Sequence, residues 1–253
     1  MKLVDARVLL TGAGGGIGQA MLRRLQAAGA AVIGVGRRAG PAGLPWVRAD
    51  LCTAEGVATV ARAAEGLGVN VVVHAAGVPA FGPLAQLDAA RITEVLQANL
   101  LAPMLLTQAL LPQLQARPRA QIVFVGSALG RIGLPGFSVY GASKAGLHGF
   151  AEALRRELAD GPVRVQILGP RSTRTAFNDA AVQAYNEATG TSMDTPETVA
   201  EALCRLLESE AAERFVGFPE RLAVRLNGVL GGHLDGSFAR HRRQLALAEG
   251  AQP

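Results

Sequence analysis

The chain has 253 residues, of which 49% are hydrophobic and only 18% are charged. Disorder through excess charge is therefore excluded, and the 31 glycines follow no Gly-X-Y period, which excludes a collagen-like protein. Two cysteines, Cys52 and Cys204, are too few for a disulfide framework or a thiolate metal cluster. We expect a single domain over residues 1–253, without a metal site, in a reducing compartment.

The net charge of +5 raises the question of a polyanionic partner. Lys and Arg are scattered, however, apart from Arg37-Arg38 and a late cluster at Arg240, Arg242 and Arg243. Aromatic residues make up only 4% of the chain, too few for platforms on which bases stack. Nucleic-acid binding is therefore a weak hypothesis, and we expect no such partner.

The sequence shows neither a signal-peptide core nor a membrane span. Asp5 and Arg7 interrupt the first apolar residues. The apolar run from Leu100 to Leu106 stops at Thr107, well short of the length that crosses a bilayer. These features predict a cytoplasmic protein.

Short β-branched or aliphatic runs alternate with longer stretches of helical apolar spacing, which is typical of a parallel sheet covered by helices on both faces. The predicted strands are Val8–Thr11, Ala31–Val35, Trp46–Ala49, Asn70–His74, Gln121–Gly126, Val163–Leu168 and Arg214–Gly217. The predicted helices run from Ile17 to a left-handed cap at Gly29, from about Thr53, from Asp88 to Leu111 before Pro112, over about 139–159, and from Thr195 to about Ser209. Together they predict one doubly wound α/β sheet.

A glycine-rich turn, Thr11-Gly12-Ala13-Gly14-Gly15-Gly16-Ile17-Gly18, follows the first strand and opens the first helix. Amide N–H groups and the helix dipole at this position can hold a pyrophosphate, and glycine permits close backbone approach. A flexible turn is the alternative, but the strand–turn–helix context favours dinucleotide binding.

The spacing T-G-x-x-x-G-x-G of Gly12, Gly16 and Gly18 resembles the nucleotide-binding signature of the short-chain dehydrogenase/reductase family. The resemblance extends over most of the chain. It implies a Rossmann-type three-layer sandwich with a seven-stranded parallel sheet, a nicotinamide cofactor, and a homodimer or homotetramer that pairs through the long helices.

The second strand ends in Val35-Gly36-Arg37-Arg38, where an NAD-specific fold usually places an acid on the ribose 2′-hydroxyl. An acid there would repel the 2′-phosphate of NADP, whereas Arg37 offers a planar cation that can grip it. The sequence therefore favours NADP(H) over NAD(H), with two solvated arginines as the alternative.

Further segments resemble the family's cofactor contacts. His74-Ala75-Ala76-Gly77 is similar to its N-x-A-G segment, with His74 interpreted as a structural hydrogen-bonding residue. Pro170-Arg171-Ser172-Thr173-Arg174-Thr175 keeps the Pro and last Thr of P-G-x-[VI]-x-T, but Arg171 replaces the Gly. The resemblance implies cofactor contacts at Gly12, Gly14, Gly15, Gly16, Ile17, Gly18, Arg37, Arg38, Asp50, Leu51, Ala75, Ala76, Gly77, Tyr140, Lys144, Pro170, Thr173 and Thr175. For Arg171 and Arg174, contacts with an anionic substrate or the cofactor phosphates and simple solvation are about equally favoured.

Tyr140 and Lys144 are four residues apart, which places a phenol and an ammonium on one face of a helix. A nearby cation favours the phenolate and is expected to lower the tyrosine pKa toward the working range. Ser127 ends the preceding strand, where it can donate to a carbonyl oxygen. Ser127, Tyr140 and Lys144 match the family's catalytic set in order and spacing.

Asn99 matches the family's fourth catalytic position. Pro103 has no N–H to donate to the Asn99 carbonyl, so that carbonyl should be released and the helix bent. The resemblance implies a water on this carbonyl that links Lys144 to a proton relay. A kinked helix with a solvent-facing Asn99 is the alternative.

The segment at about 172–192 is expected to form a substrate lid with Phe177 and Tyr185 as apolar walls, opposite Val78–Pro83. The extension at about 219–253 is the least family-like part. Its basic apolar stretch 221–230 is compatible with a pocket cover, a subunit contact or peripheral contact with an anionic membrane surface, but a packed helix with a solvated basic face is favoured.

These features predict an NADP(H)-dependent oxidoreductase that interconverts a carbonyl, of ketone or 3-oxoacyl type, and a secondary alcohol. We expect it to act as a reductase on an apolar substrate. A dinucleotide-binding sensor or scaffold without turnover is the alternative, against which the presence of all four catalytic residue types argues.

Overall fold

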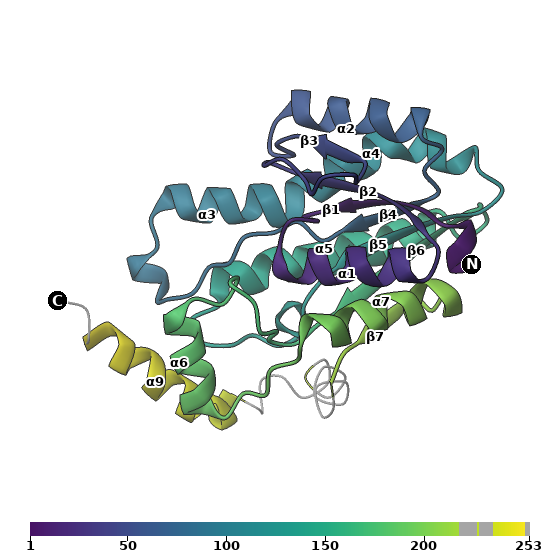
Figure 1. Cartoon of the computed structure of the whole chain (residues 1–253). Coiled ribbons are helices and arrows are strands. Elements are labelled where there is room, and N and C mark those ends of the chain that lie inside the picture. The colour runs from purple at the N-terminus through teal and green to yellow at the C-terminus, as the bar shows by residue number, and fades with distance from the viewer. Residues whose placement is uncertain (218–226, 228–234, 251–253) are drawn as a thin grey trace.

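The computed structural model of the chain describes residues 1–217, 227 and 235–250. Seven parallel strands form one sheet in the order β3-β2-β1-β4-β5-β6-β7 (Figure 1). Their bounds are β1 Arg7–Thr11, β2 Ala31–Gly36, β3 Trp46–Arg48, β4 Val71–His74, β5 Ala120–Val125, β6 Val163–Gly169 and β7 Glu213–Phe215. The predicted seven-stranded parallel sheet is confirmed, with strand ends that differ by one or two residues.

Helices cover both faces of this sheet, which confirms the three-layer sandwich (Figure 1). One face carries α1 (Gly16–Ala27) and α7 (Pro196–Ser209), and the other carries α2 (Ala54–Gly66), α4 (Ala102–Gln115) and α5 (Ser138–Glu157). Successive residues of β1 point to opposite faces, so Val8 and Leu10 join the core beneath α1 and α7, while Leu9 joins the other core. Short 3-10 turns lie at Leu3–Asp5 (η1), Leu84–Gln86 (η2) and Ala128–Gly130 (η4).

Several helix ends form where the capping residues predict them. The Thr53 hydroxyl accepts a hydrogen bond from the Gly56 N–H at 3.0 Å, and the Asp88 carboxylate accepts one from the Arg91 N–H at 2.6 Å. Gly29 follows α1 with φ of 85°, the left-handed conformation expected of a helix cap. These boundaries are therefore set by local sequence.

The helix that contains Asn99 differs from the prediction. α3 (Ala89–Leu96) continues through a π-helical turn, η3 (Gln97–Leu101), into α4, which passes through Pro112 and ends at Gln115 instead of Leu111. Pro112 lies in the exposed last turns of α4, while Leu110 and Leu114 on either side are fully buried. Their packing outweighs the one hydrogen bond that Pro112 cannot make.

By length and composition alone, the continuous run Ala89–Gln115 could cross a membrane, although the sequence predicts no stretch of that length. The difference arises because three helical segments join end to end. Core helices meet the same criteria, and Leu106, Leu110 and Leu114 of this run are fully buried against the sheet. The run is therefore weak support for a membrane span.

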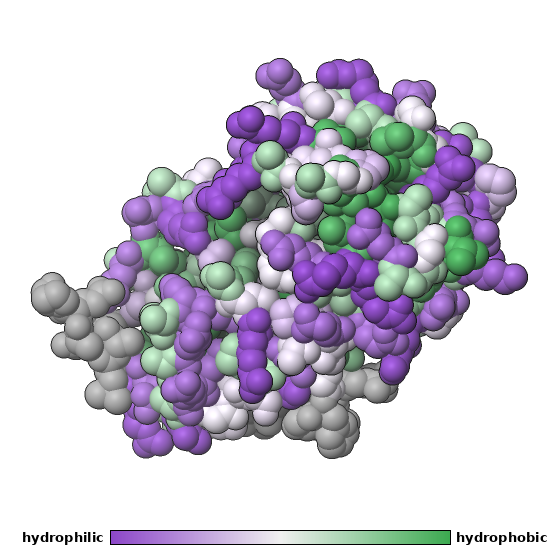
Figure 2. Space-filling model, in the orientation of Figure 1, coloured by the Kyte–Doolittle hydropathy of each residue, from purple (hydrophilic) through white to green (hydrophobic). Residues whose placement is uncertain are grey.

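The segment for which a substrate lid is predicted contains α6 (Ala180–Thr189), and the C-terminal part of the chain contains a short turn η5 (Asp235–Phe238) and α9 (Ala239–Gly250). α6 and α9 pack together at one end of the molecule (Figure 1), and their visible surface is mostly polar (Figure 2). The stretch 221–230, for which a terminal helix is predicted, lies outside the described residues except for Asn227. The Asn227 amide donates to the Arg131 carbonyl at 2.8 Å.

Candidate active site

A cavity of about 1500 Å³ opens at the carboxyl ends of the strands. Pockets for one small ligand measure roughly 300–1,000 Å³, so this cavity has room for a dinucleotide beside a second molecule. β1 pairs with β2 on one side and β4 on the other, so the strand order reverses at this point. Open parallel sheets bind ligands at such a switch point.

The three glycines of the T-G-x-x-x-G-x-G motif are each required by contacts within the protein. Gly12 has φ of 66°, and a Cβ on it would lie 2.7 Å from the Ala76 backbone. A Cβ on Gly18 would lie 2.1 Å from the Gly12 carbonyl oxygen, and one on Gly16 would lie 2.6 Å from the Thr175 side chain. A larger residue at any of these positions would displace the turn.

The other two glycines leave the start of α1 open to the cavity. The N-cap is Gly15, so no side chain covers the first backbone N–H groups of the helix. Gly14 and Gly15 are exposed and line the cavity, and a Cβ on Gly14 would have the Trp46 ring as its nearest neighbour, at 3.8 Å. Uncovered amides at a helix start bind anions, so the turn fits the pyrophosphate of a dinucleotide.

Thr11 fixes the neighbouring loop beside this turn. Its hydroxyl oxygen accepts hydrogen bonds from the Ala75 N–H at 3.0 Å and the Ala76 N–H at 3.1 Å. Ala75, Ala76 and Gly77 consequently line the cavity, where the sequence predicts cofactor contacts.

The end of β2 presents cations to the cavity. Arg37 and Arg38 are exposed and line it, and their guanidinium groups form no ion pair with a described residue. The Arg38 carbonyl accepts a hydrogen bond from the Trp46 indole at 2.9 Å, which holds the loop backbone. Asp50 and Leu51 line the cavity next to them. The arrangement fits a phosphate at the end of β2.

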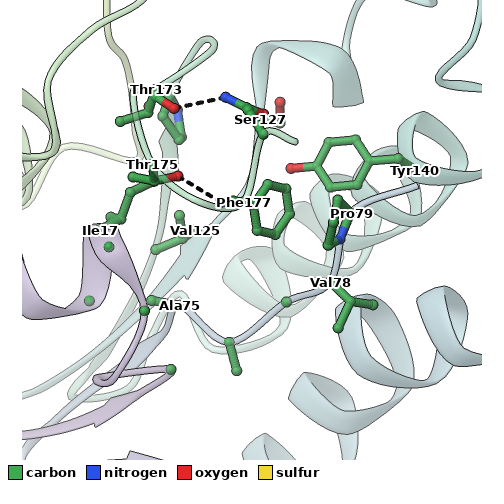
Figure 3. Close-up of a pocket in the computed structure, with 18 of the residues that line it drawn as sticks. Ile17, Ala75, Val78, Pro79, Val125, Ser127, Tyr140, Thr173, Thr175 and Phe177 are labelled. Atoms are coloured by element: carbon green, nitrogen blue, oxygen red, sulfur yellow. Dashed lines mark hydrogen bonds between the residues drawn. The ribbon is translucent and has the colours of Figure 1, made fainter. Parts of the chain in front are cut away.

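Ser127, Tyr140 and Lys144 come together on one wall of the cavity. Ser127 follows β5, and its hydroxyl oxygen accepts a hydrogen bond from the Leu129 N–H at 3.1 Å. Tyr140 lies in the first turn of α5 with its hydroxyl directed toward the side of Ser127 (Figure 3). One turn further along, the Lys144 ammonium donates to the Val125 carbonyl at 2.9 Å and lies 5.8 Å from the centre of the Tyr140 ring.

The prediction that Lys144 lowers the Tyr140 pKa is wrong for the protein alone. Burial raises the pKa of Tyr140 to about 12, and the hydrogen bond with Ser127 lowers it only in part. The Lys144 ammonium is engaged by the Val125 carbonyl, and burial lowers the pKa of Lys144 to about 8. At pH 7 the site therefore holds a protonated phenol, ready to act as a proton donor.

Asn99 is fully buried, so the solvent-facing alternative is wrong. A π-helical turn around Asn99 leads into Pro103, so the regular α-helical hydrogen bonding is interrupted there, while the bend of the helix and the release of the Asn99 carbonyl stay predictions. The Asn99 side-chain oxygen accepts from the Val78 N–H at 2.8 Å, and its amide donates to the Val78 carbonyl at 3.0 Å and the Ser143 hydroxyl at 3.2 Å. Asn99 thus joins the β4 loop to α5, while a water relay on its carbonyl stays a prediction.

His74 lies outside the cavity and has the structural contacts that the sequence predicts. Its Nε2 lies 2.9 Å from the Thr107 hydroxyl, and its ring stacks on Phe124 with centres 4.9 Å apart. Burial lowers the pKa of His74 to about 3, so the imidazole is neutral at pH 7.

Arg171 anchors the segment at about 172–192, for which a substrate lid is predicted and which is called the lid below. Its guanidinium forms a two-pronged ion pair with Asp194, with N–O distances of 3.0 and 2.8 Å. The Arg174 N–H donates to the Asp194 carbonyl, and the Asp194 N–H donates to the Ser172 carbonyl, both at 2.9 Å. The two ends of the lid are therefore joined, and Arg174 has an exposed side chain. Pro170, Thr173 and Thr175 line the cavity, as the resemblance implies.

Both apolar and polar residues line the cavity beyond Tyr140. The apolar ones are Val78, Pro79, Ala80, Ile132, Leu134, Phe137, Phe177, Val182 and Phe238, and the polar ones include Asn178, Asn186, Thr189, Thr191 and Ser192. Phe177 forms a wall as predicted, and its ring meets the Tyr140 ring edge-on with centres 5.9 Å apart (Figure 3). Tyr185 is not among the lining residues, and its ring is buried against Phe81, Phe137 and His241. Of Val78–Pro83, the residues after Ala80 also stay outside the lining.

The lining residues that sequence reasoning missed include Trp46, Phe238 and His241. The two glycines of β2 could have indicated Trp46, because glycine within a strand is typical of a site where another group comes close. A Cβ on Gly34 would lie 2.3 Å from the indole ring. Phe238 and His241 had no such signal, because only the folded chain brings their segment to the lid.

The reversal of strand order at an open glycine turn places this chain among the dinucleotide-binding α/β proteins. Comparison with known proteins identifies the family within this class. Residues 6–186 match the family model for short chain dehydrogenases, and the chain belongs to this family of oxidoreductases.

Three relatives illustrate the similarity. Nodulation protein G of Rhizobium sp. (strain N33) is 32% identical over 227 residues, which cover 83% of this chain and 93% of that protein. Ketoacyl reductase HetN of Nostoc sp. (strain PCC 7120) is 31% identical over 230 residues, which cover 85% and 79%. The crystal structure of a short chain dehydrogenase from Burkholderia cenocepacia J2315 in complex with NADP has a TM-score of 0.82 at 24% identity, over 94% of this chain and 100% of that one.

Proposed function

We propose that this protein is an NADP(H)-dependent reductase that converts an apolar ketone or 3-oxoacyl-type carbonyl compound to a secondary alcohol. The observation that carries the proposal is the meeting of Ser127, Tyr140 and Lys144 in the cavity that also holds the glycine turn. The similarity to a ketoacyl reductase supports the substrate class, and the apolar part of the lining, with Leu134, Phe137 and Phe177, supports a substrate with an apolar portion.

The residues of the site divide the reaction between them. When bound, NADPH supplies the hydride for the carbonyl carbon. The Ser127 hydroxyl donates a hydrogen bond to the carbonyl oxygen and orients it. Tyr140, protonated at pH 7, gives its proton to the alkoxide oxygen, and Lys144 one helical turn away would hold the nicotinamide ribose.

Substitution of Tyr140 tests the assigned proton donor. NADPH oxidation would be followed by absorbance over a panel of free ketones and 3-oxoacyl thioesters. Tyr140→Phe should lower kcat by about 10²–10⁴-fold, the usual contribution of a general acid, with little change in the Kd for NADPH. Equal rates in the parent and the variant would reject Tyr140 as the acid. Nucleotide binding without turnover of any carbonyl would favour the sensor or scaffold alternative.

Arg37 is proposed to bind the 2′-phosphate of NADP(H). Arg37→Ala should raise the KM for NADPH by about 10–150-fold, since a charge-assisted hydrogen bond contributes about 1.5–3 kcal/mol, and should leave the KM for NADH unchanged. Arg62→Ala is the matched control, because Arg62 is also an exposed arginine but lies on α2, outside the cavity lining. A parent enzyme with higher kcat/KM for NADH would overturn the NADP(H) preference.

We also propose a homodimer or homotetramer that pairs through the long helices. Leu96, Leu101 and Leu105 of the α3–α4 run are 37–41% exposed, which is a substantial apolar surface for one helical run. Light scattering coupled to size exclusion would test this proposal, and a monomeric mass would reject it.

A further inference from the structure

The C-terminal segment reaches the substrate end of the cavity. α9 packs against the lid helix α6 at the end of the molecule that lies away from the sheet (Figure 1). Phe238 and His241, at the start of this segment, line the cavity. Neither residue belongs to the glycine turn or to the wall that carries Ser127 and Tyr140. We therefore assign both residues to the part of the cavity that the substrate would occupy.

An aromatic cluster holds the His241 ring in position. Tyr185 of α6 is only 5% exposed, and its ring centre lies 5.0 Å from that of Phe81, 5.8 Å from that of Phe137 and 5.6 Å from that of His241. The Phe238 ring meets His241 edge-on at 5.9 Å. Packing on two sides therefore fixes the imidazole before a substrate arrives.

The hydrogen bonds of Tyr185 determine which nitrogen of His241 carries the proton. The Tyr185 hydroxyl lies 3.1 Å from the Pro135 carbonyl oxygen and 2.8 Å from His241 Nδ1. A carbonyl oxygen only accepts, so both contacts are hydrogen bonds at once only when the single hydroxyl proton of Tyr185 goes to Pro135. The phenol oxygen must then accept from Nδ1–H of His241.

A neutral imidazole that is protonated on Nδ1 has an unprotonated Nε2, which can only accept a hydrogen bond. Burial and the charge of Arg240 lower the pKa of His241, which favours this neutral form at pH 7. Within the described part of the chain, Tyr185 is the hydrogen-bond partner of His241, so Nε2 is available to a ligand.

We propose that His241 is a specificity-determining residue, whose Nε2 accepts a hydrogen bond from a hydroxyl or amide N–H at the end of the substrate remote from the reacting carbonyl. The inference rests on the proposed reductase function and deepens it. Leu134, Phe137 and Val182 contribute apolar lining to the same cavity. The substrate class is thus an apolar carbonyl compound that carries a hydrogen-bond donor at its far end.

Matched substrates test the assignment without altering the protein. A series of ketones of increasing chain length would carry, at the far end, a hydroxyl, a secondary amide with an N–H, or the methyl ether and N-methyl amide that match them in size but cannot donate. At the length that spans the cavity, kcat/KM for a donor compound should exceed that of its blocked partner by about tenfold, the effect of one hydrogen bond. The hydroxyl and amide arms distinguish the two donor groups.

Variants of the site assign this preference to His241. His241→Leu should reduce the ratio between donor and blocked compounds to near one. Tyr185→Phe removes the partner of Nδ1, so both tautomers become available and the ratio should fall by a smaller factor. Arg243→Gln, at an exposed position on the same helix and outside the cavity lining, should leave the ratio unchanged.

The outcomes separate this inference from the function on which it rests. A parent enzyme that reduces donor and blocked ketones with equal kcat/KM at every chain length overturns the role of His241 and leaves the reductase function intact. A donor preference that survives in His241→Leu also overturns it. Absence of NADPH oxidation with every ketone overturns the reductase function and this assignment together.

Discussion

The two sides of the cavity are built in different ways. On the nucleotide side, glycines lie so close to neighbouring atoms that the backbone itself defines the surface, as at Gly12 and Gly18. On the substrate side, the walls depend on side chains from distant segments, such as Tyr185 and His241, which are 56 positions apart. A short motif can therefore specify the first side, whereas the second can change its substrate through a few contacts between segments.

The largest effect should come from filling the backbone contact at Gly18. Gly18→Ala places a Cβ 2.1 Å from the Gly12 carbonyl oxygen, and we expect a loss of about 3 kcal/mol in the free energy of unfolding together with weaker NADPH binding. Urea unfolding and nucleotide titration measure the two quantities.

Gly15→Ala is the matched control for this substitution. Its Cβ would lie 3.4 Å from the nearest atom, an ordinary contact, so the unfolding free energy should change by about 1 kcal/mol or less, while NADPH binding still weakens. Equal stability losses in the two variants would contradict a nucleotide side defined by rigid backbone contact.

A smaller effect is expected at His74, where burial lowers the pKa to about 3. Below pH 6.5 the unfolded chain binds a proton at this histidine that the folded chain cannot. The free energy of unfolding therefore decreases as the pH is lowered from about 6.5 to 3. The contribution is about 2 kcal/mol between pH 7 and pH 5, and His74→Asn should remove it. Urea unfolding at a series of pH values measures the slope.

The same slope compares a buried histidine outside the cavity with one that lines its substrate side. His241 on the substrate side is only half-buried, and His241→Leu should flatten the pH dependence less than His74→Asn does. An unchanged slope in His74→Asn would show that the folded protein binds a proton at His74.

The smallest effect should come from the ion pair at the lid. Asp194→Asn keeps the shape of the side chain but removes its charge beside Arg171, and we expect a loss of about 1 kcal/mol and faster proteolysis of the lid. Glu197→Gln, which removes an exposed ion pair with Arg23, should change stability by much less. If Asp194→Asn weakened nucleotide binding as much as it loosened the lid, the separation of the two sides would fail.

The sequence alone predicts the structure correctly wherever interactions within one short stretch determine it. The strands follow from their apolar runs, the caps at Thr53 and Asp88 follow from side chains that reach the next turn, and the four-residue spacing of Tyr140 and Lys144 follows from the helical period. The family resemblance supplies Ser127 through its place at the end of β5.

Other features depend on the folded environment and cannot be read in this way. The passage of α4 through Pro112 depends on the burial of its neighbours, and the high pKa of Tyr140 depends on how far the phenol is removed from water. The burial of Tyr185 depends on Phe81 and Phe137 and on a histidine 56 positions further along, which meets its hydroxyl. Long-range contacts decide each of these outcomes, and short sequence patterns do not encode them.

The paired hydrogen bonds between the Asn99 amide and the Val78 backbone have an evolutionary consequence. Val78 lies between the proposed nucleotide contacts at Ala75–Gly77 and the residues of the proposed substrate side. The two hydrogen bonds hold its main chain and leave its side chain free to be exchanged. Descendants of this protein could acquire new substrates by exchanging side chains at positions 78–80. An insertion in that loop, by contrast, would detach the tether and disturb both ligands at once.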